Sequence, residues 1–126
     1  GRTVGFADGY PFLLTNTESV KFLSTDFRTI PMNRFRPNIV VSGDRAFMED
    51  KWRNFEIGDV TFRMAKLCSR CVVTNVDQRS GEVDDHHQAV FRRIIQARRS
   101  DNFGINLIHK GEGTIQVGDM VHLPIP

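Results

Sequence analysis

Two cysteines stand three positions apart in the stretch Cys68-Ser69-Arg70-Cys71, and the chain has no others. A pair at this spacing could hold zinc, exchange disulfides or fill a core. A zinc site needs about four ligands, and none of the histidines stands at zinc-finger spacing from the pair. Arg70 directly precedes Cys71, and a cationic neighbour favours a thiolate. Residue types alone leave a reactive thiolate and an inert buried thiol equally open.

Disulfide exchange depends on the secondary structure next to the pair. A thioredoxin-like dithiol stands at the N-terminus of a helix, where the helix dipole lowers the pKa of the thiol. Here residues 71–76 form a β-branched run, Cys-Val-Val-Thr-Asn-Val, which predicts a strand. This prediction disfavours a redox dithiol.

Arg34, Arg36 and Asn38 surround Pro37 at the entrance of a predicted strand. Arginine offers a planar fork of donors that binds phosphate or carboxylate at two points, so the group could form an anion clamp. Polar side chains also often satisfy the carbonyls of loops, so a structural role is equally open.

Other polar clusters carry weaker signals. His86 and His87 follow Asp84 and Asp85 in a polar segment, which predicts a solvated loop rather than a metal site. The clearest helix spans residues 89–98, and we expect four arginines on its solvated face: Arg92, Arg93, Arg98 and Arg99.

Composition bounds the class of protein. The chain has 126 residues, of which 40% are hydrophobic and 25% charged, as in an ordinary soluble globular domain. The net charge of +2 is too small and too dispersed for a nucleic-acid binder. No apolar run approaches the roughly 20 residues that span a bilayer, so we expect no membrane partner. Two cysteines are too few for a secreted disulfide framework, which predicts a cytoplasmic location.

Many short strands with Gly and Asp turns predict a mainly β (α+β) fold, a β-barrel or a strongly bent mixed sheet with a few short peripheral helices. Strands are expected at residues 4–6, 12–14, 39–41, 60–64, 71–76 and 105–108. Helices are expected at residues 18–23, with Asn16 or Thr17 as the cap, and at residues 47–52 and 89–98. A last hairpin joins residues 115–117 to 120–123. No dinucleotide loop, Walker loop or nucleophile elbow is present, which excludes several common enzyme classes.

The ordered motifs of the chain resemble the MOSC domain family, which is named for the C-terminal region of molybdenum-cofactor sulfurases. They are closest to the branch that contains the amidoxime-reducing component and its bacterial homologues. The motifs are FADGYP at 6–11, RFRPNIVVSG at 34–43, EDKW at 49–52, IGDV at 57–60, CSRC at 68–71, TNVD at 74–77, FGINLI at 103–108 and GTIQVGD at 113–119.

This resemblance implies that the domain binds the molybdenum cofactor (molybdopterin), with Cys71 as the catalytic thiolate ligand of molybdenum. Arg36 and Asn38 match residues that hold the pterin and the phosphate. Further matching positions lie beside the metal or line the pocket: Ser69, Arg70, Asn106, Asp8, Gly9 and Tyr10. A soft thiolate suits molybdenum beside the sulfurs of the cofactor.

The resemblance also implies an oxidoreductase that reduces N-hydroxylated compounds. Its partners would be a small-molecule substrate and a ferredoxin- or cytochrome-type electron donor. The alternative is a sulfur carrier that receives a persulfide on Cys71 from a cysteine desulfurase. A third possibility is a domain that only completes a pocket together with another region. Pyridoxal phosphate binding is also associated with the family, and we take it as a property of the family only. We expect a single domain over residues 1–126, cut from a longer protein whose N-terminal β-barrel region lies outside this chain.

Overall fold

The computed structural model describes residues 3–6, 12–24, 28–85 and 89–123. Two α-helices, three short 3₁₀ helices (η) and eight strands follow one another along these residues. Their order is β1 (Thr3–Phe6), β2 (Phe12–Asn16), α1 (Thr17–Leu23), η1 (Met32–Phe35), β3 (Ile39–Val41), η2 (Met48–Lys51), β4 (Asn54–Ile57), β5 (Val60–Ser69), η3 (Val72–Asn75), α2 (Val90–Arg98), β6 (Asn102–Lys110), β7 (Gly113–Gln116) and β8 (Val121–His122).

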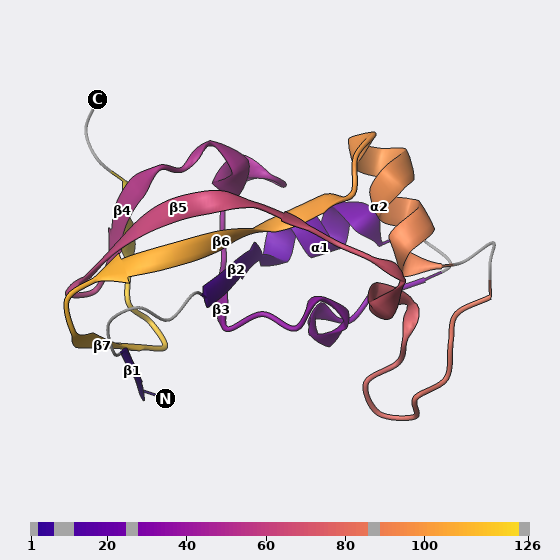
Figure 1. Cartoon of the computed structure of the whole chain (residues 1–126), viewed down its shortest axis with the longest axis horizontal. Coiled ribbons are helices and arrows are strands. Elements are labelled where there is room, and N and C mark those ends of the chain that lie inside the picture. Colours follow the sequence, from indigo (N-terminus) through magenta and orange to yellow (C-terminus); the bar gives the residue numbers. More distant parts are fainter. Residues whose placement is uncertain (1–2, 7–11, 25–27, 86–88, 124–126) are drawn as a thin grey trace.

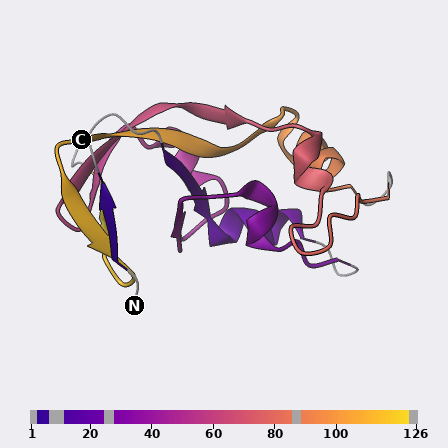
Figure 2. The ribbon, with the colours of Figure 1, turned by 60° about the horizontal axis from the view of Figure 1, so that its bottom comes forward.

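Six strands form one mixed sheet in the order β3-β2-β6-β5-β4-β8. The β2–β3 pair is parallel and the other pairs are antiparallel. β1 and β7 form a separate two-stranded sheet (Figure 1). In Figure 2 the long strands β5 and β6 arch over β3 and α1, and the β1–β7 pair stands at one end of the arch. The predicted fold, a strongly bent mixed sheet with a few short helices, is confirmed.

The core has two parts. One lies on the sheet and collects apolar side chains from β2 to β7, with Phe55, Phe62 and Leu107 at most 1% exposed. The other joins α1, η1 and α2 to the start of β6, where the rings of Phe35 and Phe103 stack with centroids 4.1 Å apart. The second part fixes the helical segments against the sheet, and the candidate site lies beside it.

The two α-helices form where the sequence predicts them. Asn16 caps α1, because its side chain accepts a hydrogen bond from the amide of Glu18 at 3.0 Å. α2 buries Val90 and Ile94, which lie one turn apart on the same face.

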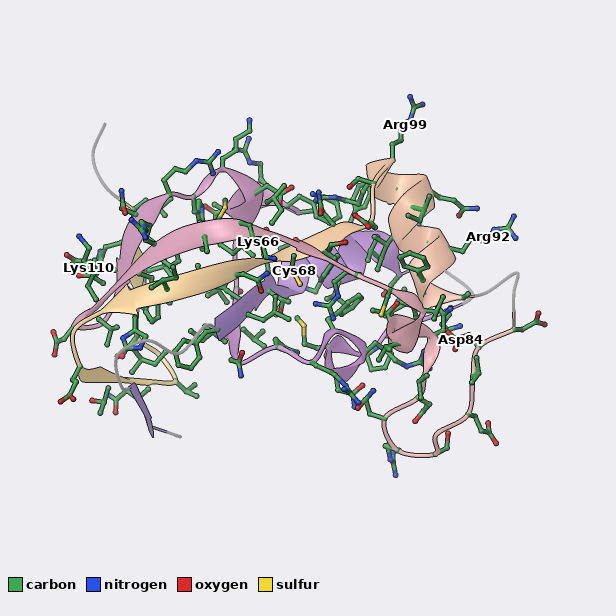
Figure 3. The ribbon with its side chains drawn as sticks, in the orientation of Figure 1. Lys66, Cys68, Asp84, Arg92, Arg99 and Lys110 are labelled. Atoms are coloured by element: carbon green, nitrogen blue, oxygen red, sulfur yellow. The ribbon has the colours of Figure 1, made fainter. Side chains whose placement is uncertain are left out.

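Two of the four arginines expected on the solvated face of α2 are engaged instead. Arg93 donates to the carbonyl of Leu23 at 3.0 Å, which caps the end of α1. Arg98 pairs with Asp50 and lies over the ring of Phe47 at 3.9 Å from its centroid. Arg92 and Arg99 are exposed (Figure 3), so the prediction was wrong for half of the set.

The predicted strand at residues 71–76 was also wrong, because its central residues form η3. β-branched residues favour a strand where they can pack on a neighbouring pleated surface. Pairing of β5 with β6 ends at Ser69, and the side chains of Val72 and Val73 are exposed. The amide of Thr74 instead turns back to the carbonyl of Cys71 at 3.1 Å.

The turn of the predicted last hairpin is present, but the two strands beside it do not pair with each other. The amide of Asp119 donates to the carbonyl of Gln116 at 3.1 Å, which closes the turn. The flanking strands then separate, since β7 pairs with β1 and β8 pairs with β4. The turn therefore connects the two sheets.

A completely buried side chain, that of Glu49, joins η2 to α1 and its N-cap. It accepts hydrogen bonds from the hydroxyl of Ser19 at 2.8 Å and from the amide of Asn16 at 3.2 Å. Burial raises the pKa of Glu49, and hydrogen bonds from its own backbone, Ser19 and Asn16 offset only part of that effect.

Glu49→Gln is therefore expected to flatten the dependence of stability on pH. A carboxyl group with a raised folded-state pKa stabilises the protein below its unfolded pKa and loses this contribution as pH rises through the folded pKa. Thermal unfolding from about pH 4 to pH 8 should show wild type losing about 1 kcal/mol or more relative to the variant. The exposed Glu56 provides the control, because Glu56→Gln should leave the profile unchanged. Parallel profiles for wild type and Glu49→Gln would contradict the expectation.

Candidate functional site

Cys71 lies where β5 has ended and η3 begins, at the N-cap position of η3, and its thiol is exposed. Its carbonyl accepts from the hydroxyl of Thr74 at 2.9 Å as well as from the Thr74 amide. Cys68 is still within β5 and is half-buried. A redox dithiol was disfavoured because a strand was expected after the two cysteines. The residues after Cys71 form η3 instead, so this reason does not hold.

Arg70 connects the end of β5 to η1. Its guanidinium donates to the carbonyl of Phe35 and to the thiol sulfur of Cys68, the latter at 3.4 Å. The amide of Arg70 donates to the carbonyl of Asp101 at 2.8 Å, and the hydroxyl of Ser69 donates to the Asp101 carboxylate at 2.7 Å. The segment that carries the cysteines is thus held by η1 on one side and by the start of β6 on the other.

Arg36 directly follows η1 and adopts a left-handed conformation with φ of 54°. Its side chain is exposed and donates to the side-chain oxygen of Gln78 at 3.3 Å. Among the described residues, neither Arg36 nor Arg70 forms an ion pair with a carboxylate. Both guanidiniums therefore keep donors and charge for an anion.

Asn38 and Asn106 both lie next to the backbone of Leu13. The side-chain oxygen of Asn38 accepts from the Leu13 amide at 2.8 Å, and the Asn38 amide donates to the Leu13 carbonyl at 2.9 Å. Asn106 lies opposite Leu13 on β2 and opposite Lys66 on β5. Asn38 thus extends the β2–β3 pairing, which is the structural role that the sequence left open for it.

Arg34 has a structural role as well. Its side chain is 6% exposed and pairs with Asp84, whose side chain is 7% exposed, at 2.9 Å. Burial alone would raise the pKa of Asp84, but hydrogen bonds from Arg34, Arg28 and the amide of Val90 outweigh it and hold the pKa below its usual value. With its charge used in this pair, Arg34 is not part of an open anion clamp.

The structure thus forms two groups of predicted residues. Arg70, between Ser69 and Cys71, contacts Phe35, the residue before Arg36, while Asn38 and Asn106 flank Leu13. Asp8, Gly9 and Tyr10 lie outside the described residues.

Two contributors were missed by sequence reasoning. Lys66 is exposed, two positions before Cys68 on β5 (Figure 3), and it lies beyond the strand that was predicted at residues 60–64. Asp84 was taken as part of a solvated loop, and no local signal reveals its distant arginine partners.

The donor set limits which metal chemistry is open to this region. Within the part of the chain that the structure describes, no three His, Cys, Asp or Glu side chains come together as a ligand cluster. A metal held by Cys71 would thus take its other ligands from a bound group or from outside the described residues. The exposed thiol of Cys71 and the charges of Arg36 and Arg70, unpaired within the described part of the chain, fit a cofactor that brings its own sulfur ligands and a phosphate.

The chain is similar to known proteins both in sequence and in fold. A family model described as the MOSC domain matches residues 1–122. The chain is 32% identical over 130 residues to mitochondrial amidoxime-reducing component 1 of Homo sapiens. It is 43% identical over 129 residues to mitochondrial amidoxime reducing component 2 of Rattus norvegicus, and 32% identical over 121 residues to molybdenum cofactor sulfurase of Homo sapiens.

These three matches cover 95%, 94% and 85% of this chain, but 39%, 38% and 13% of the respective relatives. The fold is similar to that in the crystal structure of YiiM from Geobacillus stearothermophilus, with a TM-score of 0.68. That likeness covers 98% of this chain and 61% of the other at 16% sequence identity, and it concerns the fold alone.

Proposed function

The chain belongs to the MOSC domain family, and from this membership we propose that it binds the molybdenum cofactor with Cys71 as the thiolate ligand of molybdenum. One observation carries the proposal. Cys71 is exposed at the end of β5 and directly follows Arg70, whose guanidinium pairs with no carboxylate among the described residues. The names of the relatives support it, since one group is called molybdenum cofactor sulfurase.

In this proposal the residues of the chain bind and orient, while the bound cofactor supplies the redox chemistry. Arg36 offers its fork to a phosphate, and Arg70 holds the cysteine-bearing segment against η1. Asn106 lies within the sheet, opposite Leu13 of β2, and Asn38 holds the backbone of Leu13 from the other side. Ser69 orients the segment through Asp101.

The reaction that we propose is the reduction of N-hydroxylated small molecules, with electrons supplied by a ferredoxin- or cytochrome-type protein. Support comes from the relatives named amidoxime-reducing components, of which this chain spans less than half. Those relatives are named as mitochondrial, so the cytoplasmic location predicted from the cysteine count stays a prediction. None of the described helices is long and apolar enough to cross a bilayer.

A sulfur-carrier function is the second candidate, and the exposure of the Cys71 thiol favours it. The thiolate would attack the outer sulfur of a persulfide on a cysteine desulfurase, take that sulfur and leave the donor with a thiolate. The two candidates differ in what Cys71 carries. Intact-protein mass spectrometry after incubation with a desulfurase and cysteine would detect one added sulfur atom on Cys71 that a reductant removes.

The test of the leading proposal is the molybdenum content of Cys71→Ala. Protein made in a host that produces the cofactor is expected to contain molybdenum, and loss of the thiolate ligand should lower the content by at least about tenfold. Cys68→Ala is the matched control, since it removes the neighbouring thiol and should retain most of the metal. Equal molybdenum in wild type and Cys71→Ala would exclude Cys71 as the ligand.

A further inference from the structure

The backbone of Cys71 is fixed by Thr74. The carbonyl of Cys71 accepts two hydrogen bonds from this residue, from the amide at 3.1 Å and from the hydroxyl at 2.9 Å. Thr74 is 2% exposed, so water cannot readily replace the hydroxyl as a donor. Its side chain therefore sets the conformation of the turn from which the Cys71 thiol projects.

Thr74 is itself held by the buried ion pair. The guanidinium of Arg34 donates to the Thr74 carbonyl at 3.3 Å and to the Asp84 carboxylate at 2.9 Å. Asp84 also accepts from Arg28 at 2.8 Å. Arg34 also lies 3.8 Å from the carboxylate of Asp77, so two carboxylates of the chain balance the two arginines, and Arg34 serves η3 rather than an external anion.

The N-terminus of α2 completes the support. Ala89 provides no side-chain cap, and the first amides of the helix are satisfied from elsewhere. The amide of Val90 donates to Asp84 at 3.1 Å, and the amide of Phe91 donates to the side-chain oxygen of Asn75 at 2.8 Å. Since Asn75 belongs to η3, α2 and the Cys71 turn are joined as one unit.

We infer that Thr74 is a positioning residue for Cys71, and that the Arg34–Asp84 pair keeps Thr74 in place. This inference rests on the proposed function in that the positioned thiolate is the one that would bind molybdenum. The direction of the Cα–Cβ bond of Cys71 depends on its backbone torsions, which the two hydrogen bonds from Thr74 fix. A ligand held in one orientation releases its metal more slowly than one that must be reordered.

Thr74→Val separates positioning from packing, because valine keeps the shape of threonine and lacks the hydroxyl. At a temperature where all proteins are folded, this variant should release molybdenum about tenfold faster than wild type. Thr74→Ser keeps the hydroxyl and is expected to restore the slow release. Thr114→Val makes the same chemical change at an exposed position of β7 and should have no effect.

A second readout is independent of the metal. In metal-free protein with Cys68→Ser, iodoacetamide should alkylate Cys71 several-fold faster in Thr74→Val than in wild type, because the thiol is no longer held in one orientation. Serine at position 74 is again expected to restore the wild-type rate. If Thr74→Val does not fold, Thr74→Ala carries the same expectations, since it also lacks the hydroxyl.

The outcomes distinguish the inference from the function on which it rests. Unchanged release and unchanged alkylation in Thr74→Val would overturn the positioning role, even if wild type binds molybdenum. Wild type without molybdenum would overturn the proposed function, and the alkylation rates would then decide the positioning role alone. Failure of Thr74→Ser to restore either rate would also count against it, because packing rather than the hydroxyl would be responsible.

Discussion

Replacing Gly104 by alanine is expected to lower the free energy of unfolding by about 3 kcal/mol or more. Gly104 lies inside β6 with φ of 83°, a conformation that residues with a side chain rarely adopt. An added Cβ would lie 2.9 Å from the carbonyl oxygen of Leu14 in β2. Because that atom is backbone, it can move away only if β2 separates from β6. Unfolding in urea, followed by circular dichroism, measures the change.

Gly111→Ala is the matched control for this prediction. Gly111 also has a positive φ, 72°, but an added Cβ would meet nothing within 4 Å. It should therefore lose only the backbone contribution, about 1–2 kcal/mol. Equal losses at Gly104 and Gly111 would show that the close approach of β2 and β6 does not limit residue 104.

The second large effect is expected for Arg34→Met, which should cost about 3–5 kcal/mol at neutral pH. The substitution leaves the carboxylate of Asp84 buried with Arg28 as its remaining cationic partner among the described residues. It also removes the donor to the Thr74 carbonyl. Arg92→Met, on the exposed face of α2, is the control and should change stability by no more than about 0.5 kcal/mol.

The pH dependence of this loss has a definite sign. The folded-state pKa of Asp84 lies below its usual value, so its contribution is present above the unfolded pKa and is lost as pH falls through the folded pKa. In acid, Asp84 is protonated with or without Arg34. The difference in stability between wild type and Arg34→Met should therefore be largest at neutral pH and shrink in acid. A difference that stays constant would mean that Arg34 acts through packing and not through Asp84.

Local signals predicted the parts of the fold that local interactions determine. Asn16 before an acidic first turn predicts α1, and the spacing of Val90 and Ile94 predicts α2. Such signals do not predict which strands pair when they are distant in sequence. Residues 72–75 have strand-forming side chains but pair with none of the described strands, and β7 and β8 pair with β1 and β4 rather than with each other. The strand predicted at residues 105–108 begins after Gly104, whereas β6 already begins at Asn102.

For the site, the sequence predicted candidate positions but not the contacts that their side chains make. Arg34 and Arg36 stand two positions apart, yet one is buried in an ion pair and the other is exposed. The difference depends on Asp84, which is 50 positions from Arg34 in sequence. The position-by-position roles of the exposed residues stay predictions, and the metal and alkylation measurements test them.

The strand order of the sheet also determines when the protein can fold during its synthesis. β4 and β5 are neighbours in sequence and can pair as soon as both have left the ribosome. β2 needs β6, whose residues 102–110 are made late in the chain. Until then the nascent chain exposes Leu14, which is fully buried in the folded protein. Folding that waits for such distant contacts is slow, and the waiting chain is open to aggregation and to chaperones.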